Sequence, residues 1–222
     1  MKTNEILKRN VLEAIQWEPL LHAAEIGVIV NDGIVTLTGT VDSYAKKLEA
    51  ENAAKKVAGV KAIVEEIKID YGHYAFTTDE EIAKEVIDAF ESSYTIPEDK
   101  LKIKVEKGWV TIFGDVNWYY QKEAARNAIL NLKGVRGATN NIEIIPDAKD
   151  EIEKKDIEKA LRRNWAINYD DIDIVVEGNK VTLLGVVDSY YEKDEAERIA
   201  YNAPGVWSVN NELVVDFDDY DG

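Results

Sequence analysis

Cysteine is absent from the 222-residue chain, which excludes disulfide bonds and thiolate-bound metals. Long apolar stretches are absent as well, since no run reaches the ~18 residues of a membrane-spanning helix. No apolar segment follows Lys2, so the N-terminus does not resemble a secretory signal. We therefore expect no transmembrane segment and a cytoplasmic location, or a periplasmic one if an export signal has been removed.

Basic residues are scarce relative to acidic ones. The chain has 27 Lys and Arg against 43 Asp and Glu, which gives a net charge of −16 at pH 7. Residues 1–70, 71–146 and 147–222 carry net charges of −2, −3 and −11, so the last third is the acidic one. Nucleic-acid binding requires a basic face, so we expect no nucleic-acid partner. Adsorption to anionic lipid is disfavoured for the same reason.

Catalytic motifs are also missing. The two histidines, His22 and His73, lie in a loop and a linker, and neither is spaced from a nucleophile or a metal ligand in a known pattern. No glycine-rich phosphate loop or dinucleotide fingerprint occurs. Carboxylate pairs are abundant, but 43 acidic residues produce such pairs by chance. We expect a protein that is not an enzyme and that uses no cofactor.

Internal repetition is the strongest signal in the sequence. One pattern of glycine, valine and tyrosine occurs three times, at residues 33–44, 108–119 and 179–190. A Gly-Val pair follows each copy, at Gly59-Val60, Gly134-Val135 and Gly205-Val206. The first two copies are 75 residues apart and the last two are 71 apart. The chain is therefore three tandem copies of one module.

Each copy reads as helix, strand, strand, helix, strand. Alternating apolar residues predict the strands, and a glycine or asparagine between the first two strands predicts a tight hairpin. We expect an α+β protein of three tandem αββαβ modules, each a three-stranded mixed sheet with two helices packed on one face. The predicted modules span residues 1–70, 77–146 and 150–218.

The first helix of each module carries an apolar stripe at helical spacing. The three stripes are Leu7, Val11 and Ile15, then Ile82, Val86 and Phe90, then Ile157, Leu161 and Trp165. They are 75 residues apart in both steps, which places the four-residue shortening of module three in the loop after its first helix. The second helix is expected to begin after an N-cap, and Ser189 with Glu192 fits a capping box. Asn117-Trp118 replaces Asp-Ser in the second copy, which leaves the capping of that helix open.

The sequence resembles the BON (bacterial OsmY and nodulation) domain family. Copies one and three carry the resemblance through Gly39–Ser43 with Gly59-Val60 and through Gly185–Ser189 with Gly205-Val206. The resemblance implies a bacterial, non-enzymatic module associated with osmotic or envelope stress. It also implies contact with phospholipid surfaces or with transport systems, and one relative is described as binding potassium.

Tyrosine recurs at the start of the second helix in each copy, and the second copy adds a tryptophan. The candidate binding residues are Tyr44, Trp118, Tyr119, Tyr120, Tyr190 and Tyr191. An aromatic body with a polar tip suits an interface. Two interpretations remain open: the rings cover the sheet edge and fix the helix start, or they form a repeated contact for a partner.

A cluster of aspartates near the C-terminus is the candidate metal site. Its members are Asp216, Asp218, Asp219 and Asp221. Carboxylate oxygens bind hard cations, although the spacing does not match an EF-hand, and a solvated acidic tail is the alternative.

Taken together, these features predict a BON-type binding or scaffold protein associated with stress or transport. It would act through contacts with a protein, a phospholipid surface or another copy of itself, so a homo-oligomer is possible. The alternative is a protein that binds a small ligand or a cation, either potassium or a divalent ion.

Overall fold

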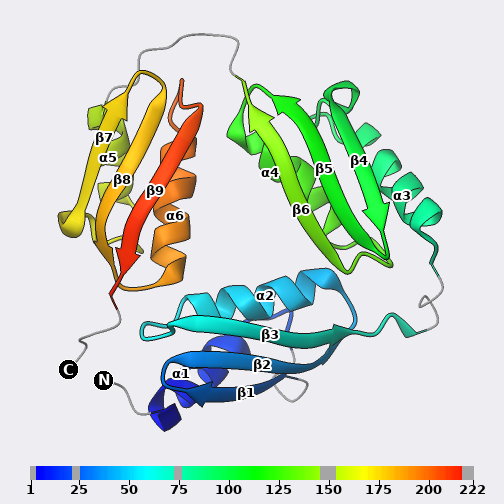
Figure 1. Ribbon diagram of the computed structural model, residues 1–222, viewed down its shortest axis with the longest axis horizontal. Coiled ribbons are helices and arrows are strands. Elements are labelled where there is room, and N and C mark those ends of the chain that lie inside the picture. The colour runs from blue at the N-terminus through cyan, green and yellow to red at the C-terminus, as the bar shows by residue number, and fades with distance from the viewer. Residues whose placement is uncertain (1–3, 22–25, 73–76, 146–153, 217–222) are drawn as a thin grey trace. The chain divides into compact units, whose positions relative to one another are not determined.

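The computed structural model describes residues 4–21, 26–72, 77–145 and 154–216. In this part of the chain the strands form three separate three-stranded sheets, and in each sheet the middle strand in sequence lies between the other two (Figure 1). The order helix, strand, strand, helix, strand repeats three times. The structure confirms the predicted α+β fold of three modules, whereas the predicted module boundaries stay a prediction.

The helices and strands have the following bounds. Module 1 contains α1 (Asn4–Gln16), β1 (Ile26–Asn31), β2 (Ile34–Val41), α2 (Tyr44–Lys55) and β3 (Ala62–Ile69). Module 2 contains α3 (Asp79–Glu91), the 3-10 helix η3 (Glu98–Lys100), β4 (Leu101–Glu106), β5 (Trp109–Val116), α4 (Tyr119–Ile129) and β6 (Gly137–Ile144). Module 3 contains α5 (Lys154–Arg163), the 3-10 helix η4 (Tyr169–Asp171), β7 (Ile172–Glu177), β8 (Lys180–Val187), α6 (Tyr190–Tyr201) and β9 (Ser208–Val215).

The first two strands of each module form an antiparallel hairpin with a two-residue loop. Asp32 and Gly33 both have positive φ, as do Lys107 and Gly108, which is the pattern of a type I′ turn. In the two-residue hairpin loop of module 3, Gly178 has positive φ and Asn179 does not, so that hairpin uses the type II′ pattern instead. The second helix then returns the chain to a strand parallel to the middle one, as the pairings of β5 with β6 and of β8 with β9 show.

A glycine near the end of the middle strand is required by a close backbone approach. Gly114 and Gly185 have φ of 129° and 123°. A Cβ atom at Gly114 would lie 2.2 Å from the carbonyl oxygen of Lys100, and one at Gly185 would lie 2.0 Å from that of Asp171. The 3-10 turn before the first strand therefore presses against the middle strand where only glycine leaves room.

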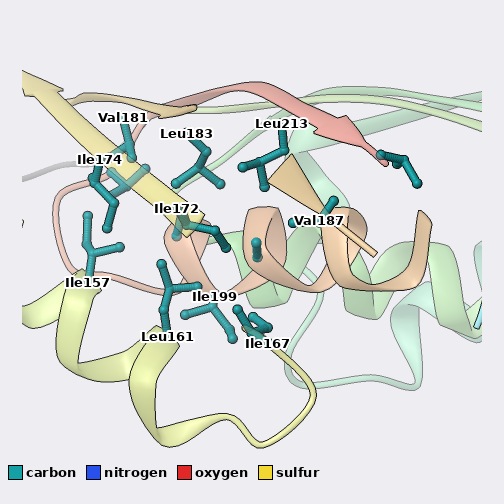
Figure 2. Packing of buried hydrophobic residues seen from close by; sticks show 14 residues of the cluster. Ile157, Leu161, Ile167, Ile172, Ile174, Val181, Leu183, Val187, Ile199 and Leu213 are labelled. Atoms are coloured by element: carbon teal, nitrogen blue, oxygen red, sulfur yellow. The ribbon is translucent and has the colours of Figure 1, made fainter. Parts of the chain in front are cut away.

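Each module buries its own apolar core between the helices and one sheet face. Figure 2 shows this packing in module 3, where Ile157 and Leu161 of α5 point toward side chains from the strands and Ile199 of α6 lies beside Leu161. Among the module 3 core residues, those on strands include Ile172, Ile174, Val181, Leu183, Val187 and Leu213. The alternation that predicted the strands is confirmed, since these residues are all less than 5% exposed.

The prediction for Trp165 is wrong. Helix α5 ends at Arg163, and the Trp165 side chain is 96% exposed. Ile167 enters the core in its place, at 8% exposure. The loop itself is not shortened, because Asn164 N–H donates to the Leu161 carbonyl and Ile167 N–H to the Asn164 carbonyl. The same two bonds occur in module 2, with residues numbered 71 lower.

Those matching bonds align Leu161 with Phe90, the last core residue of α3. The four-residue shortening of module 3 therefore lies before this loop and not within it. Four residues are close to one helical turn, so the shortening leaves the apolar stripe on the same helix face. The apolar spacing therefore looked unchanged in the sequence. Aligning module 3 with module 2 at an offset of 75 residues then placed Trp165 at the position of Phe90, where the correct offset of 71 places Leu161.

Candidate functional site

The start of α6 is held by two side chains. The Ser189 hydroxyl accepts a hydrogen bond from Glu192 N–H at 3.1 Å, which confirms the predicted N-cap. Glu192 is only 4% exposed. Its Oε2 accepts from Asp188 N–H at 2.9 Å, and its Oε1 accepts from Asn168 N–H in the loop before η4. The buried carboxylate therefore joins the helix start to the loop that follows α5.

The start of α4 is held by a different side chain. Trp118 is the N-cap residue and has no side-chain acceptor to offer. Gln121 supplies one instead: its Oε1 accepts from Asn117 N–H at 3.1 Å and from Trp118 N–H at 3.0 Å. The helix is thus capped without the N-cap side chain, and the Trp118 ring is 46% exposed.

Trp118 is one of three exposed apolar side chains near the start of α4 and the end of β6. Tyr120 on α4 and Ile145, just after β6, are both 54% exposed. Asn117 connects the two segments, because its side-chain amide donates to the Ile145 carbonyl at 3.3 Å and its Oδ1 accepts from Lys100 Nζ at 3.0 Å. We call Trp118, Tyr120, Ile145 and the adjacent Lys100 the module 2 patch.

The other predicted aromatic residues are less exposed. Tyr44, Tyr119, Tyr190 and Tyr191 are all half-buried. Tyr190 packs against the module 3 core. The six candidate residues therefore differ in exposure from one module to another. Trp118 and Tyr120 alone among them are exposed, and both lie on module 2.

The positions equivalent to the patch differ in the other two modules. Module 1 has Ser43, Ala45 and Asp70, and module 3 has Ser189, Tyr191 and Asp216. The N–H groups of Asp70, Ile145 and Asp216 each donate to the equivalent carbonyl of the middle strand, which confirms the alignment. Asp171 of module 3 stands where module 2 has Lys100. Module 2 therefore has tryptophan and isoleucine where both other modules have serine and aspartate, and it has Lys100 where module 3 has Asp171.

Among the described residues, sequence reasoning missed the three most exposed aromatic side chains. Trp17, Tyr94 and Trp165 lie in the loops after the first helices and are 85%, 101% and 96% exposed. Tyr94 and Trp165 each precede by two positions a buried isoleucine, Ile96 and Ile167.

Ion pairs at the module surfaces perturb several carboxylates. Arg198 donates from Nε and from a terminal nitrogen to the two oxygens of Glu195, at 2.7 and 2.6 Å. These bonds hold the pKa of Glu195 below its usual value, and Asn164 adds a further hydrogen bond at 2.8 Å. Lys46 lowers the pKa of Asp42 in the same way, from 2.8 Å. Such pairs stabilise ionised carboxylates at the surface.

The candidate metal residues are only partly within the described part of the chain. Asp216 is exposed, whereas Asp218, Asp219 and Asp221 lie outside the described residues, as do His22 and His73. Over residues 4–21, 26–72, 77–145 and 154–216, no three His, Asp or Glu side chains gather closely enough to hold a metal ion. Within the same ranges, no helix has the length and apolar character needed to cross a membrane.

The fold defines a protein built from tandem αββαβ modules. The BON domain model matches residues 3–71, 78–146 and 149–216, so the chain belongs to the BON domain family. Each match covers the helix-strand-strand-helix-strand unit of one module. The family assignment made from the glycine and valine pattern is confirmed.

Two relatives share parts of the sequence. The osmotically-inducible protein Y of Escherichia coli is 26% identical over 131 residues, which cover 55% of this chain and 63% of that protein. An uncharacterized protein of Anaplasma centrale, encoded in the gshII 5′ region, is 44% identical over 62 residues, covering 27% of this chain and 41% of that protein. The chain thus spans less than two thirds of the length of either relative.

Among solved structures, CdsD of Chlamydia trachomatis, a structural protein of the type III secretion system, aligns with 95% of this chain and 92% of its own. The identity is 15% and the TM-score is 0.25. A likeness at that score carries no argument about fold or function.

Proposed function

We propose that this chain is a non-enzymatic binding protein of the osmotic stress response and that it recruits a protein partner through the module 2 patch. Membership of the BON family and the name of the E. coli relative support the stress association. The observation that carries the binding role is the exposure of Trp118, Tyr120 and Ile145 around one hydrogen-bonded amide, Asn117.

The chemistry of the patch favours a protein partner. Tryptophan and tyrosine are enriched at protein interfaces, where they bury a large area and still offer a polar atom. Lys100 supplies one positive charge, which suits a carboxylate on the partner. A net charge of −16 opposes approach to an anionic lipid surface.

The module 1 residues provide a mild way to remove the patch. The triple variant Trp118→Ser, Tyr120→Ala and Ile145→Asp installs the residues that module 1 carries at these positions, so the module should keep its fold. Tyr119 is left unchanged because it is half-buried. The control is Tyr94→Ser, which removes a fully exposed aromatic side chain from the same module.

The measurement is crosslinking of the full chain in cells after an osmotic upshift, followed by quantification of each crosslinked protein. We expect the triple variant to lower recovery of at least one protein by about tenfold or more, as loss of a hot spot would, and the control to leave it unchanged. Vesicles of zwitterionic and of anionic lipid test the other partner class. Equal recovery from the triple variant and wild type would refute the role of the patch, and binding to vesicles that depends on it would replace the protein partner with lipid.

A further inference from the structure

Three-stranded sheets leave two edges each, and unpaired edges invite pairing with another chain. The third strands of all three modules are protected in one way. In each third strand, one backbone N–H donates a hydrogen bond to the side-chain oxygen of the residue two positions earlier. The donors are Ile67, Ile142 and Leu213, and the acceptors are Glu65, Asn140 and Asn211. Asn140 and Asn211 also donate to helix carbonyls, at 2.9 Å in both modules. These edges already have a side chain bonded to their backbone.

The first strands of modules 2 and 3 are protected by charge. On β4, Lys102, Lys104 and Glu106 alternate along the solvent-facing side. On β7, Asp173 and Glu177 occupy the equivalent positions at each end. Charged side chains on an edge strand oppose the approach of a second strand.

Strand β1 of module 1 has neither protection. Its sequence, IGVIVN, contains no charged residue. Gly27, Ile29 and Asn31 stand where module 2 has Lys102, Lys104 and Glu106, and Ile29 is 60% exposed. In a chain of net charge −16, this uncharged edge offers two copies a place to meet with little repulsion.

The hairpin register shows which backbone groups of β1 face outward. Asn31 pairs with Ile34 across a two-residue turn, so Asn31, Ile29 and Gly27 exchange hydrogen bonds with β2. The N–H and carbonyl groups of Ile26, Val28 and Val30 therefore point away from β2. Among the residues that the structure describes, none donates to or accepts from these outward groups.

We propose that β1 pairs antiparallel with β1 of a second copy of this chain, joining the two module 1 sheets into one six-stranded sheet. This inference does not depend on the proposed function. With Val28 on the two-fold axis, Val28 pairs with Val28 of the second copy, and Ile26 pairs with its Val30. The outward N–H and carbonyl groups of both strands are then satisfied.

The same register is complementary in shape. Ile29 comes to lie opposite Gly27 of the second copy, in a pair without hydrogen bonds between the two, where side chains approach most closely. The branched side chain of Ile29 thus lies opposite a glycine, which has no side chain, and the two-fold axis repeats this pair. Ile34 and Val64 lie on the same exposed sheet face as Ile29, at 43% and 41% exposure, and extend the apolar surface inward from the edge.

The test is the mass of the full-length chain in solution. A single strand pair buries well under the ~1,200 Å² of a stable complex, so association should be weak and require concentrations of about 10–500 µM. By sedimentation equilibrium, the wild-type average mass should rise with concentration from 25.0 kDa toward twice that value. Ile29→Lys, which installs the module 2 residue, should hold the mass at that of one chain.

A matched control distinguishes an effect specific to β1 from a general effect of adding a positive charge. Val175→Lys adds the same charge at the equivalent position of β7, which is 42% exposed, and should associate like wild type. Hydrogen exchange gives a second readout that does not depend on a variant: the amides of Val28 and Val30 should slow as concentration rises, and those of Ile103 and Val105 on β4 should not. Higher salt should strengthen association, because it screens the repulsion between acidic chains.

Several results would overturn the proposal. A wild-type mass that stays at one chain, or an Ile29→Lys variant that still associates, excludes pairing through β1. Equal loss in Val175→Lys assigns the effect to charge alone. Unchanged exchange at Val28 and Val30 in an associating sample places the interface elsewhere.

Discussion

Modules 2 and 3 secure the start of the second helix with different side chains, and only module 3 bonds that side chain to the preceding loop. In module 3, the two oxygens of Glu192 accept from Asp188 N–H and Asn168 N–H. In module 2, Gln121 takes the place of Glu192, and Pro97 takes the place of Asn168. Proline has no N–H, so one fewer acceptor is needed, and a single amide oxygen is sufficient.

The difference shows that a single backbone N–H in the loop can explain why module 3 has a buried carboxylate and module 2 an amide. An acceptor with two oxygens occurs where the loop presents an N–H, and an amide occurs where it does not. Because the N-cap residues Pro97 and Asn168 have similar φ, −77° and −82°, the two solutions fit the same backbone path. Four predictions test this comparison, each by hydrogen exchange on the full chain, since exchange reports on each module separately.

The largest effect should come from Glu192→Ala. It leaves two buried or half-buried N–H groups without an acceptor, at a cost of about 2–4 kcal/mol. Exchange of core amides such as that of Leu183 should accelerate at least about thirtyfold, while module 2 amides stay unchanged. An acceleration of exchange below about tenfold would mean that water replaces the carboxylate. Glu192 would then not be the link between the helix start and the loop.

A smaller effect should come from Glu192→Gln, which keeps one acceptor and turns an amide donor toward the other N–H. We expect a loss of about 1–2 kcal/mol. Adding Asn168→Pro reproduces the module 2 pair and should restore most of the lost stability, as φ at that position permits. The double-mutant cycle should give a coupling of about 1 kcal/mol; additive losses would contradict the pairing of these two positions.

Gln121→Ala should cost about 1 kcal/mol in module 2, the usual value of a helix cap. The N–H groups of Asn117 and Trp118 are partly accessible, so water replaces part of the lost bond. Adding Trp118→Ser should recover the loss, because a serine at that position caps α6 in module 3. Failure of the serine to recover stability would show that Gln121 acts through packing and not through capping.

The smallest effect concerns acid sensitivity. Module 3 has Glu195 where module 2 has Ala124, and the pKa of Glu195 is lowered by Arg198. A lowered folded-state pKa stabilises the module above the unfolded value near 4.3, and this contribution is lost as the pH falls through the lowered pKa. Between about pH 6 and 3.5, Glu195→Gln should therefore flatten the pH dependence of module 3 exchange, corrected for intrinsic rates, by under ~1 kcal/mol. An unchanged slope would show that other carboxylates dominate.

Most of the fold was predictable because it depends on local periodicity. The alternation in Ile172–Val176, the hairpin glycines and the alanine-rich second helices each specify a short segment without reference to the rest of the chain. Because the module occurs three times, each of these patterns could be compared across three copies. Trp165 shows where this reasoning fails: a helical period predicts a buried face but does not report where the helix ends.

The candidate site was predictable only in part. Recurrence of tyrosine marked the start of the second helices, yet exposure distinguished Trp118 and Tyr120 from Tyr190, which packs on its own core. Exposure depends on which side chain fills the space beside a ring, and that neighbour comes from another segment. Ile145, distant in sequence from Trp118, joined the patch only through the fold.

By itself, the sequence determined the number of modules, the order of their elements and most residues of each core, because hydrophobic spacing and turn chemistry act over a few residues. Tertiary structure alone decided which carboxylate is buried, which aromatic rings reach solvent and which strand edge is unprotected. These properties depend on atoms brought together from separate segments, such as Asn168 and Glu192. Their hydrogen bonds and exclusion of water exist only once the module is packed.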